Sequence, residues 1–206
     1  MLEEALALIE ESGTASLTLR EVARRIGVSH AAPYRQFADR RELLTALTTE
    51  GSKELAARIL AALEGAGEDL RARFLAAGFA YVSFALERPA LFQATYSAEA
   101  DPADPQLAAA KQRSFGILLG FIEEAQRAGA FRPGDPTELA TPIWAMHHGL
   151  ATLAAAGLFA EQGPEGLRRV VDDAHASLLD GLLRPAPSAQ SVQSVPPPPL
   201  RRPPRR

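Results

Sequence analysis

The stretch of residues 18–44 constrains the fold of this chain more than any other part of the sequence. It begins with apolar residues spaced three and four apart, as one face of a short helix requires, and a second helical pattern follows at residues 30–37. Between the two, Gly27 can adopt a positive φ at no steric cost, while Thr18 and Ser29 are good N-caps for the two helices. Two short helices joined by such a turn are typical of a helix-turn-helix, whose second helix enters the DNA major groove.

The charge of this stretch also indicates a DNA-facing surface. Residues 14–44 contain six arginines against three acidic residues, in a chain whose net charge is −3. A local basic surface on an acidic protein indicates a phosphate-binding end. The alternative is a small helical hairpin whose arginines form a solvated face. Because Pro33 lacks the N–H that would bond to the carbonyl of Ser29, we expect a slightly distorted first turn in the second helix.

The same region carries the landmarks of a known family. The run GTASLTLREVARRIGVSHAAPYRQFADRRELL resembles the DNA-binding domain of the TetR family of bacterial transcriptional regulators, with its Ala-Arg-Arg, Gly-Val-Ser, Tyr-x-x-Phe and Leu-Leu landmarks in register. The resemblance implies which side chains contact bases and which contact phosphates. By this resemblance, the residues expected to contact bases are Arg20, His30, Ala31 and Ala32. Those expected to contact phosphates are Thr18, Tyr34, Gln36 and Arg40. The predicted DNA-binding set also includes Ser29 and Arg35.

Downstream of this region the chain shows helical patterns only. Apolar residues recur at helical spacing, and no alternating run typical of strands is present, so the predicted fold class is all-α. We predict an N-terminal helix-turn-helix domain of three helices at residues 1–50, followed by a helical ligand-binding and dimerisation bundle at residues 51–183. The boundary falls near Gly51, inside a long helix that can act as a lever. Residues 184–206 are rich in proline and arginine, cannot bury a core and are expected to be disordered.

Start and stop signals bound the individual helices. Asp39 and Glu42 can form a capping box at the start of the long helix, and Asp135 followed by Pro136 provides a cap and a proline in the first helical position. The patterns predict helices over residues 2–12, 19–26, 30–37, 39–63, 68–87, 106–128, 136–159 and 164–183, with a shorter one that begins at Pro89.

A second signature lies in the last third of the chain. Trp144, His148 and Gly149 resemble the Trp-x-x-x-His-Gly signature of one C-terminal domain type within the TetR family. The resemblance implies that the last two helices form a four-helix bundle with the same pair from a second subunit, giving a homodimer. The sequence is compatible with this arrangement, because glycine and alanine recur between residues 149 and 157 and allow close approach of helices.

Aromatic residues of the second domain suggest a ligand pocket. Trp144 and His148 are four residues apart and so share one helical face. We predict that they line a pocket for an apolar or amphipathic small molecule, whose other walls are Phe79, Phe84, Phe92, Tyr96 and Phe115. The alternative is that these residues belong to the core and the dimer interface. His147 and His148 diverge by about 100° on a helix, which suits joint metal binding poorly, so we predict no metal and no cofactor.

Composition and motifs exclude several other classes of protein. The chain has no cysteine, and it has neither a long apolar run nor a secretory leader, so we expect a cytoplasmic protein without a membrane span. No nucleophile elbow, phosphate loop or zinc-protease motif is present, so an enzyme is not predicted. We expect a homodimeric, ligand-responsive regulator that reads an inverted repeat in DNA, most often a repressor in the resembled family. The alternative is an all-α carrier or enzyme that does not bind DNA.

Overall fold

The computed structural model describes residues 1–183, and all regular structure within them is helical. The all-α prediction is therefore confirmed for this part of the chain. The tail predicted at residues 184–206 lies outside the described residues. The α-helices of residues 1–183 are α1 (Leu2–Ser12), α2 (Leu19–Arg25), α3 (Arg40–Gly65), α4 (Leu70–Glu87), α5 (Pro89–Thr95), α6 (Pro105–Arg127), α7 (Pro136–Ala155) and α8 (Gly163–Leu183).

Capping side chains fix where the first helices begin. The Thr18 hydroxyl accepts a hydrogen bond from the backbone N–H of Glu21, 3.1 Å away, at the start of α2. The Asp39 carboxylate accepts from the N–H of Glu42 at the start of α3, and the Glu42 carboxylate accepts in return from the N–H of Ala38. The predicted capping box is thus present, except that Glu42 accepts from the N–H of the residue before the N-cap residue Asp39.

The later helices begin in the same way. Asp69, Asp104 and Asp135 cap α4, α6 and α7, each accepting a backbone N–H two or three residues further on. Proline follows Asp104 and Asp135 directly, where its missing N–H costs no helical hydrogen bond. Local sequence therefore determines the helix starts almost to the residue.

The helix predicted over residues 30–37 does not form as a regular α-helix. The chain turns at residues 30–32 and forms only a short 3₁₀ segment, Pro33–Arg35. Because Pro33 has no N–H to offer, the Ser29 carbonyl accepts instead from the N–H of Ala32 at 2.9 Å, which is a tighter turn than an α-helix makes. The expected distortion therefore extends through the whole segment. Gly27 has the predicted positive φ, at 70°.

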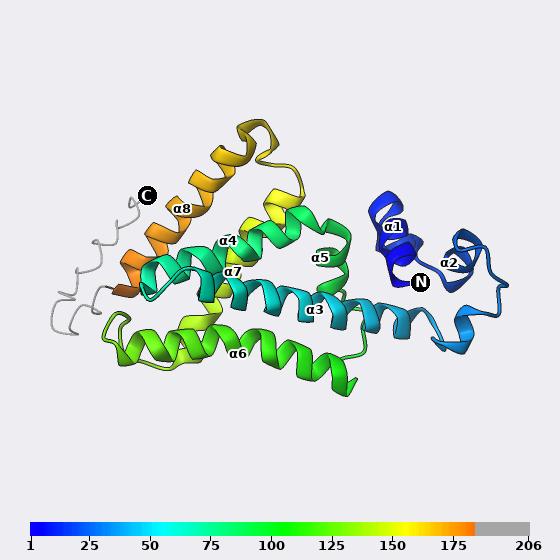
Figure 1. The fold of residues 1–206 in the computed structure, drawn as a ribbon, viewed down its shortest axis with the longest axis horizontal. Helices are drawn as coiled ribbons and strands as arrows, with labels where there is room; N and C mark the ends of the chain where they lie inside the picture. Colours follow the sequence, from blue (N-terminus) through cyan, green and yellow to red (C-terminus); the bar gives the residue numbers. More distant parts are fainter. Residues whose placement is uncertain (184–206) are drawn as a thin grey trace, which may run out of the picture.

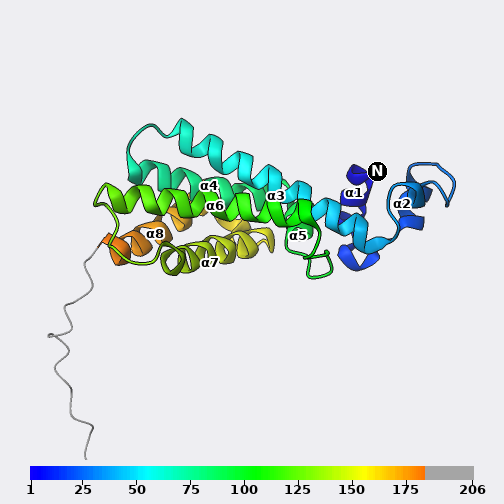
Figure 2. The same cartoon turned by 90° about the horizontal axis from the view of Figure 1, so that it is seen from below.

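The long helix α3 runs between the two ends of the molecule (Figure 1). Its N-terminal end lies beside α1 and α2, and the rest of its length packs on α4, α5 and α6. Seen from below, α4 and α6 form a middle layer, and α7 and α8 lie on the side away from α3 (Figure 2). This arrangement leaves the outer faces of α7 and α8 free of other helices within residues 1–183.

One apolar core continues from the N-terminal helices into the bundle. It includes Leu6 and Leu8 of α1, Leu44 and Leu47 of α3, and Phe84 of α4, all buried. The two predicted domains therefore share packed side chains as well as a common helix, so movement of one is mechanically linked to the other. Across residues 1–183, no helix combines the length and apolar character that a bilayer crossing requires.

The contact between α3 and α5 depends on one glycine. A Cβ atom built on Gly51 would lie 1.8 Å from the Thr95 hydroxyl oxygen, so only glycine permits this close approach. Gly51 is also where the sequence places the domain boundary, which stays a prediction. At this point α3 is tightly held by α5, the helix that leads to the loop at residues 97–104.

Candidate functional site

The predicted DNA contacts lie on an exposed surface at the N-terminal end of the molecule. Arg20 is exposed on the first turn of α2, and α2 packs on the Pro33–Arg35 segment. The predicted contact residues of these two segments therefore belong to one packed unit. Ala32 and Arg40 are half-buried. The exposed members of the predicted set are Thr18, Arg20, Ser29, His30, Ala31, Tyr34, Arg35 and Gln36.

Ion pairs separate the arginines of this surface into two groups. Arg24 and Arg25 bond to the carboxylates of Glu21 and Glu11, respectively, and the hydrogen bond from Arg24 is the main cause that lowers the pKa of Glu21 to about 2. Within residues 1–183, Arg20 and Arg35 have no carboxylate within salt-bridge distance. Their guanidinium groups are therefore available to DNA.

Arg40 has a different environment from the one that a simple phosphate contact requires. Its guanidinium donates to the backbone carbonyls of Leu17 and Thr14, at 2.8 Å each, and pairs with the Glu99 carboxylate. The two carbonyl bonds fix the guanidinium beside the helix-turn-helix, and the pair with Glu99 neutralises it. A DNA phosphate would have to displace Glu99 to bind Arg40.

A second set of contacts lies next to this ion pair. Arg41 pairs with the Asp101 carboxylate at 2.9 Å, and the backbone N–H of Asp101 donates to the Thr45 hydroxyl at 2.8 Å. Glu99 and Asp101 belong to the loop at residues 97–104, which connects α5 and α6. The first turns of α3 are thus held by the loop that leaves α5.

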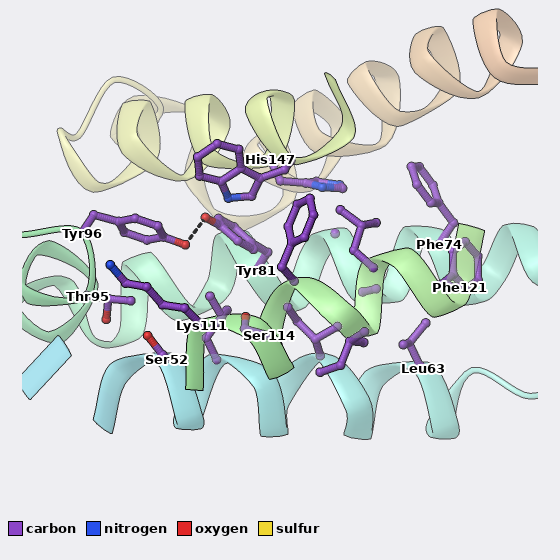
Figure 3. Close-up of a pocket in the computed structure, with 18 residues that line it drawn as sticks. Ser52, Leu63, Phe74, Tyr81, Thr95, Tyr96, Lys111, Ser114, Phe121 and His147 are labelled. Carbon is purple, nitrogen blue, oxygen red and sulfur yellow. Dashed lines mark hydrogen bonds between the residues drawn. The ribbon is translucent and has the colours of Figure 1, made fainter. Parts of the chain in front are cut away.

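The bundle encloses a cavity of about 360 Å³ between α3, α4, α6 and α7 (Figure 3). This volume lies in the range of small-molecule sites. The wall is mostly apolar, and its polar members are few: Ser52, Tyr81, Thr95, Tyr96, Lys111, Ser114 and His147, with the indole N–H of Trp144. Because helices surround the cavity on several sides, a small molecule inside it would be largely removed from water.

The structure divides the predicted ligand residues into two groups. Tyr96, Phe115 and Trp144 line the cavity. Phe79, Phe84, Phe92 and His148 do not. Phe79 packs under the guanidinium of Arg168, 4.4 Å from its ring centre, while Phe84 and Phe92 are buried in the shared core with their ring centres 6.2 Å apart. For Phe84 and Phe92, the alternative that the predicted residues belong to the core is therefore the correct one.

At the cavity wall, three side chains form a hydrogen-bonded group. The hydroxyls of Tyr81 and Tyr96 are 2.5 Å apart, and the Tyr81 hydroxyl is 3.1 Å from Nδ1 of His148. Burial raises the pKa of both tyrosines, so both hydroxyls keep their protons. Trp144 stacks on His148 with ring centres 5.7 Å apart. His148 thus supports the wall that Tyr96 and Trp144 present to the cavity.

The neighbouring histidine faces the other way. His147 lines the cavity, and its Nε2 lies 2.6 Å from Nε2 of His175 on α8. Burial lowers the pKa of His147 to about 3 and that of His175 to about 4, so both rings are neutral near pH 7 and one N–H is donated between them. A Cβ on Gly78 would lie 2.1 Å from the ring of His175, so glycine at this position of α4 admits the pair.

Six polar residues of the cavity were not among the predicted pocket residues: Ser52, Tyr81, Thr95, Lys111, Ser114 and His147. A signal for Lys111 and Ser114 was present, because Lys111, Ser114 and Phe115 follow at intervals that share one face of α6. Within residues 1–183, no group of three histidine or acidic side chains is arranged to hold a metal ion.

The outer face of α7 is built from small and apolar residues. Leu153 is 43% exposed and Ala145 is exposed, each four residues from Gly149, and no atom lies within 4 Å of a Cβ built on Gly149. The exposed residues of α8, by contrast, include Arg169 and Asp173. An exposed apolar face with a glycine in it allows a helix of another molecule to pack closely against it.

Comparison with known families decides the identity of this architecture. Residues 1–47 match the family described as "Bacterial regulatory proteins, tetR family", and residues 74–178 match "Tetracyclin repressor-like, C-terminal domain". The chain belongs to the TetR family. The resemblance seen in the sequence is thereby confirmed, and the protein is a DNA-binding transcriptional regulator and not an enzyme.

Solved structures share the whole fold. A protein of unknown function from Rhodococcus sp. RHA1 is 39% identical, with a TM-score of 0.78 over 89% of this chain and 93% of that chain. The TetR-family regulator PfmR from Thermus thermophilus is 24% identical, with a TM-score of 0.70 over 89% and 98% of the two chains. FadR from Bacillus subtilis, in complex with stearoyl-CoA, is 15% identical, with a TM-score of 0.71 over 88% and 97%. No curated protein matches the chain.

The TetR family assignment covers both halves of the site. The N-terminal match contains every predicted DNA contact, and the C-terminal match contains the cavity walls from Phe74 to His147. The Trp-His-Gly type of C-terminal domain stays a prediction, which rests on Trp144, His148 and Gly149.

Proposed function

We propose that this TetR-family regulator is a cytoplasmic homodimeric repressor that binds an inverted-repeat operator and is released by an amphipathic small molecule in the bundle cavity. The recognition segments of two subunits would sit about 34–36 Å apart, so that they enter successive major grooves on one side of the DNA. The Bacillus subtilis FadR structure, with stearoyl-CoA bound in a related fold, supports an effector with a long apolar part.

One observation carries the ligand-responsive part of the proposal. Tyr96 lines the cavity, and the loop that begins at the next residue contacts the start of α3 through Glu99 and Asp101. A ligand that shifts Tyr96 therefore acts on Arg40 and Arg41 through a few residues of backbone. Such a ligand favours whichever loop position fits it better, and DNA affinity changes by that difference in binding free energy.

The direct test of the proposal is an electrophoretic shift with DNA upstream of the protein's own gene. We expect a complex that contains two subunits and dissociates when effector is added. Sequencing of genome-wide bound DNA should then yield an inverted repeat. Binding that ignores sequence, or a complex with one subunit per site, would contradict the proposal.

Replacement of Arg20 by alanine tests the assigned base contact. The side chain is exposed and has no ion pair within residues 1–183, so its loss removes DNA contact without disturbing the fold. We expect operator binding to weaken by about 1–3 kcal/mol, with relaxed preference at one base pair. Fluorescence anisotropy with operator variants measures both effects. Arg113→Ala, which removes the same charge from the exposed side of α6, is the matched control and should leave affinity unchanged.

Replacement of Glu99 by glutamine tests the ion pair with Arg40. The substitution keeps the size of an exposed side chain but frees the Arg40 guanidinium for phosphate. We expect tighter operator binding, with a plot of log affinity against log salt that is steeper by about 0.9 per added phosphate contact. Glu123→Gln, an equal charge change on α6, should leave the salt slope unaltered. Weaker binding by Glu99→Gln would mean instead that the pair holds the DNA-competent arrangement.

A further inference from the structure

Four polar residues of the cavity, Ser52, Thr95, Tyr96 and Lys111, gather at one end of it. On α3, Ser52 is followed by Leu55, Ile59 and Leu63 along the same wall, and on α6, Lys111 and Ser114 are followed by Leu118 and Phe121. Figure 3 shows Ser52, Thr95, Tyr96 and Lys111 together at one end, with Leu63, Phe74 and Phe121 at the opposite end. The walls that α3 and α6 contribute thus change from polar to apolar in the same direction.

The polar end carries a positive charge and offers hydrogen-bond donors. Lys111 is the only cation in the cavity wall, the wall contains no acidic residue, and within residues 1–183 no carboxylate lies within salt-bridge distance of the Lys111 ammonium. The Ser114 hydroxyl can donate beside it, and the Tyr96 hydroxyl, which shares a hydrogen bond with Tyr81, lies at the same end. The hydroxyls of Ser52 and Thr95 already donate to carbonyls of their own helices, so they offer lone pairs only. An anionic group is the best match for the donors at this end.

The apolar wall of the cavity is long. Ser52 and Leu63 are eleven residues apart on α3, which corresponds to a length of about 16 Å. A molecule that fills the cavity along this direction needs an extended apolar part. The charge and the length of the apolar wall together specify the ligand more closely than apolar lining alone.

We infer that the effector is an unbranched aliphatic acyl compound whose anionic group lies at Lys111, Ser114 and Tyr96 and whose chain extends toward Phe74 and Phe121. The inference rests on the proposed ligand-responsive function and names the chemistry of its ligand. The acyl chain can arrive as a free carboxylate or as a thioester whose phosphates reach the exposed ammonium of Lys111. Both kinds of ligand place an anionic group at Lys111 and a single alkyl chain inside the cavity.

The fluorescence of Trp144 provides the assay, because it is the only tryptophan of the chain and lines the cavity. The full-length protein would be titrated, below micelle concentrations, with dodecanoate, dodecanoyl-CoA, dodecanol, hexanoate and cholate. We expect dodecanoate or its thioester to bind at least tenfold more tightly than dodecanol, which lacks the charge, and than hexanoate, which lacks the tail. Cholate, which is anionic but carries fused rings in place of a single extended chain, should bind more weakly than dodecanoate.

Lys111→Met tests the anion site directly. The substitution keeps the apolar stem of an exposed side chain and removes its charge. We expect at least tenfold weaker dodecanoate binding with unchanged dodecanol binding. Lys53→Met, at the only other lysine of the chain and on the exposed side of α3, is the matched control and should bind like the wild type.

Two results would overturn the inference. One is dodecanol binding as tightly as dodecanoate, and the other is an unchanged dodecanoate affinity in Lys111→Met. Operator binding measured on the same samples separates this failure from a failure of the proposed function. A protein that shifts its operator but ignores every acyl anion retains the proposed function and refutes only the ligand class, whereas absence of operator binding refutes the function itself.

Discussion

Replacement of Gly149 by arginine should convert the protein from a dimer into a monomer and weaken operator binding about 1,000-fold or more. A dimer that binds at about 1 nM has about −12 kcal/mol of binding free energy, and one half-site supplies about half of it, which corresponds to micromolar affinity or weaker. The structure makes this variant a clean test, because no atom lies within 4 Å of a Cβ at Gly149 and the folded monomer has room for the side chain. The charge would intrude only where a second subunit covers α7.

Sedimentation at micromolar concentration measures the oligomeric state, and thermal melting checks the fold. Gly120→Arg is the matched control, because Gly120 is also a helical glycine with open space around its Cβ position, on α6. It should remain dimeric and bind DNA normally. A wild-type protein that sediments as a monomer, or a Gly149→Arg variant that stays dimeric, would rule out α7 as the dimer surface.

The free energy of unfolding should fall as the pH is lowered from 7 to 5, because of the buried pair His147 and His175. In the unfolded chain a histidine takes up a proton near pH 6.5. In the folded protein, burial keeps the pKa of His147 at about 3 and that of His175 at about 4. Below about pH 6.5 the unfolded state therefore binds more protons than the folded state, and stability is lost with falling pH until the folded pair itself protonates.

The expected loss is large for a protein of this size. His147, which is 7% exposed, accounts for about 2 kcal/mol between pH 7 and pH 5, and His175 acts in the same direction. Other charged or titratable groups face the pair: Asp172 and Arg168 from α8, and Tyr81 from α4. His148, whose pKa burial also lowers, acts in the same direction as the pair.

Urea unfolding followed by circular dichroism at fixed protein concentration measures this pH dependence. The double variant His147→Gln and His175→Gln retains neutral hydrogen-bonding groups without a proton to gain, so its stability should change much less between pH 7 and pH 5. His30→Gln, at the exposed turn of the DNA-binding end, is the control and should keep the wild-type dependence. A double variant with the full pH dependence would assign the effect to other groups.

Local sequence information was sufficient for the helices and their caps. Thr18, Asp39 and Asp135 start helices where the sequence predicts, because capping depends on a side chain and backbone N–H groups two or three residues away. The motifs around Gly27 likewise identified the family, since a family signature is itself a pattern of neighbouring residues. The prediction of a regular second helix in the motif was wrong, and the reason is also local. Pro33 lacks the backbone N–H that would make one of the hydrogen bonds of that helix.

The cavity residues could be predicted only in part. The helix α4 is apolar on two faces, so spacing could show that Phe74 and Phe84 are buried but not which of them faces a cavity. The same limit separates His147 from His148. The Trp-His-Gly resemblance pointed to His148, yet the turn of α7 directs His147 to the cavity and leaves His148 behind Tyr81.

By itself, the sequence of this protein determined the all-α class, the DNA-binding end and the apolar nature of its bundle, because each depends on periodicity, capping or motifs within a few residues. Only the tertiary structure decided that Arg40 pairs with Glu99, that His147 meets His175 and that Lys111 stands at the polar end of the cavity. These partners are separated by tens of residues along the chain, and they meet only because the packing of several helices fixes their relative rotation and register.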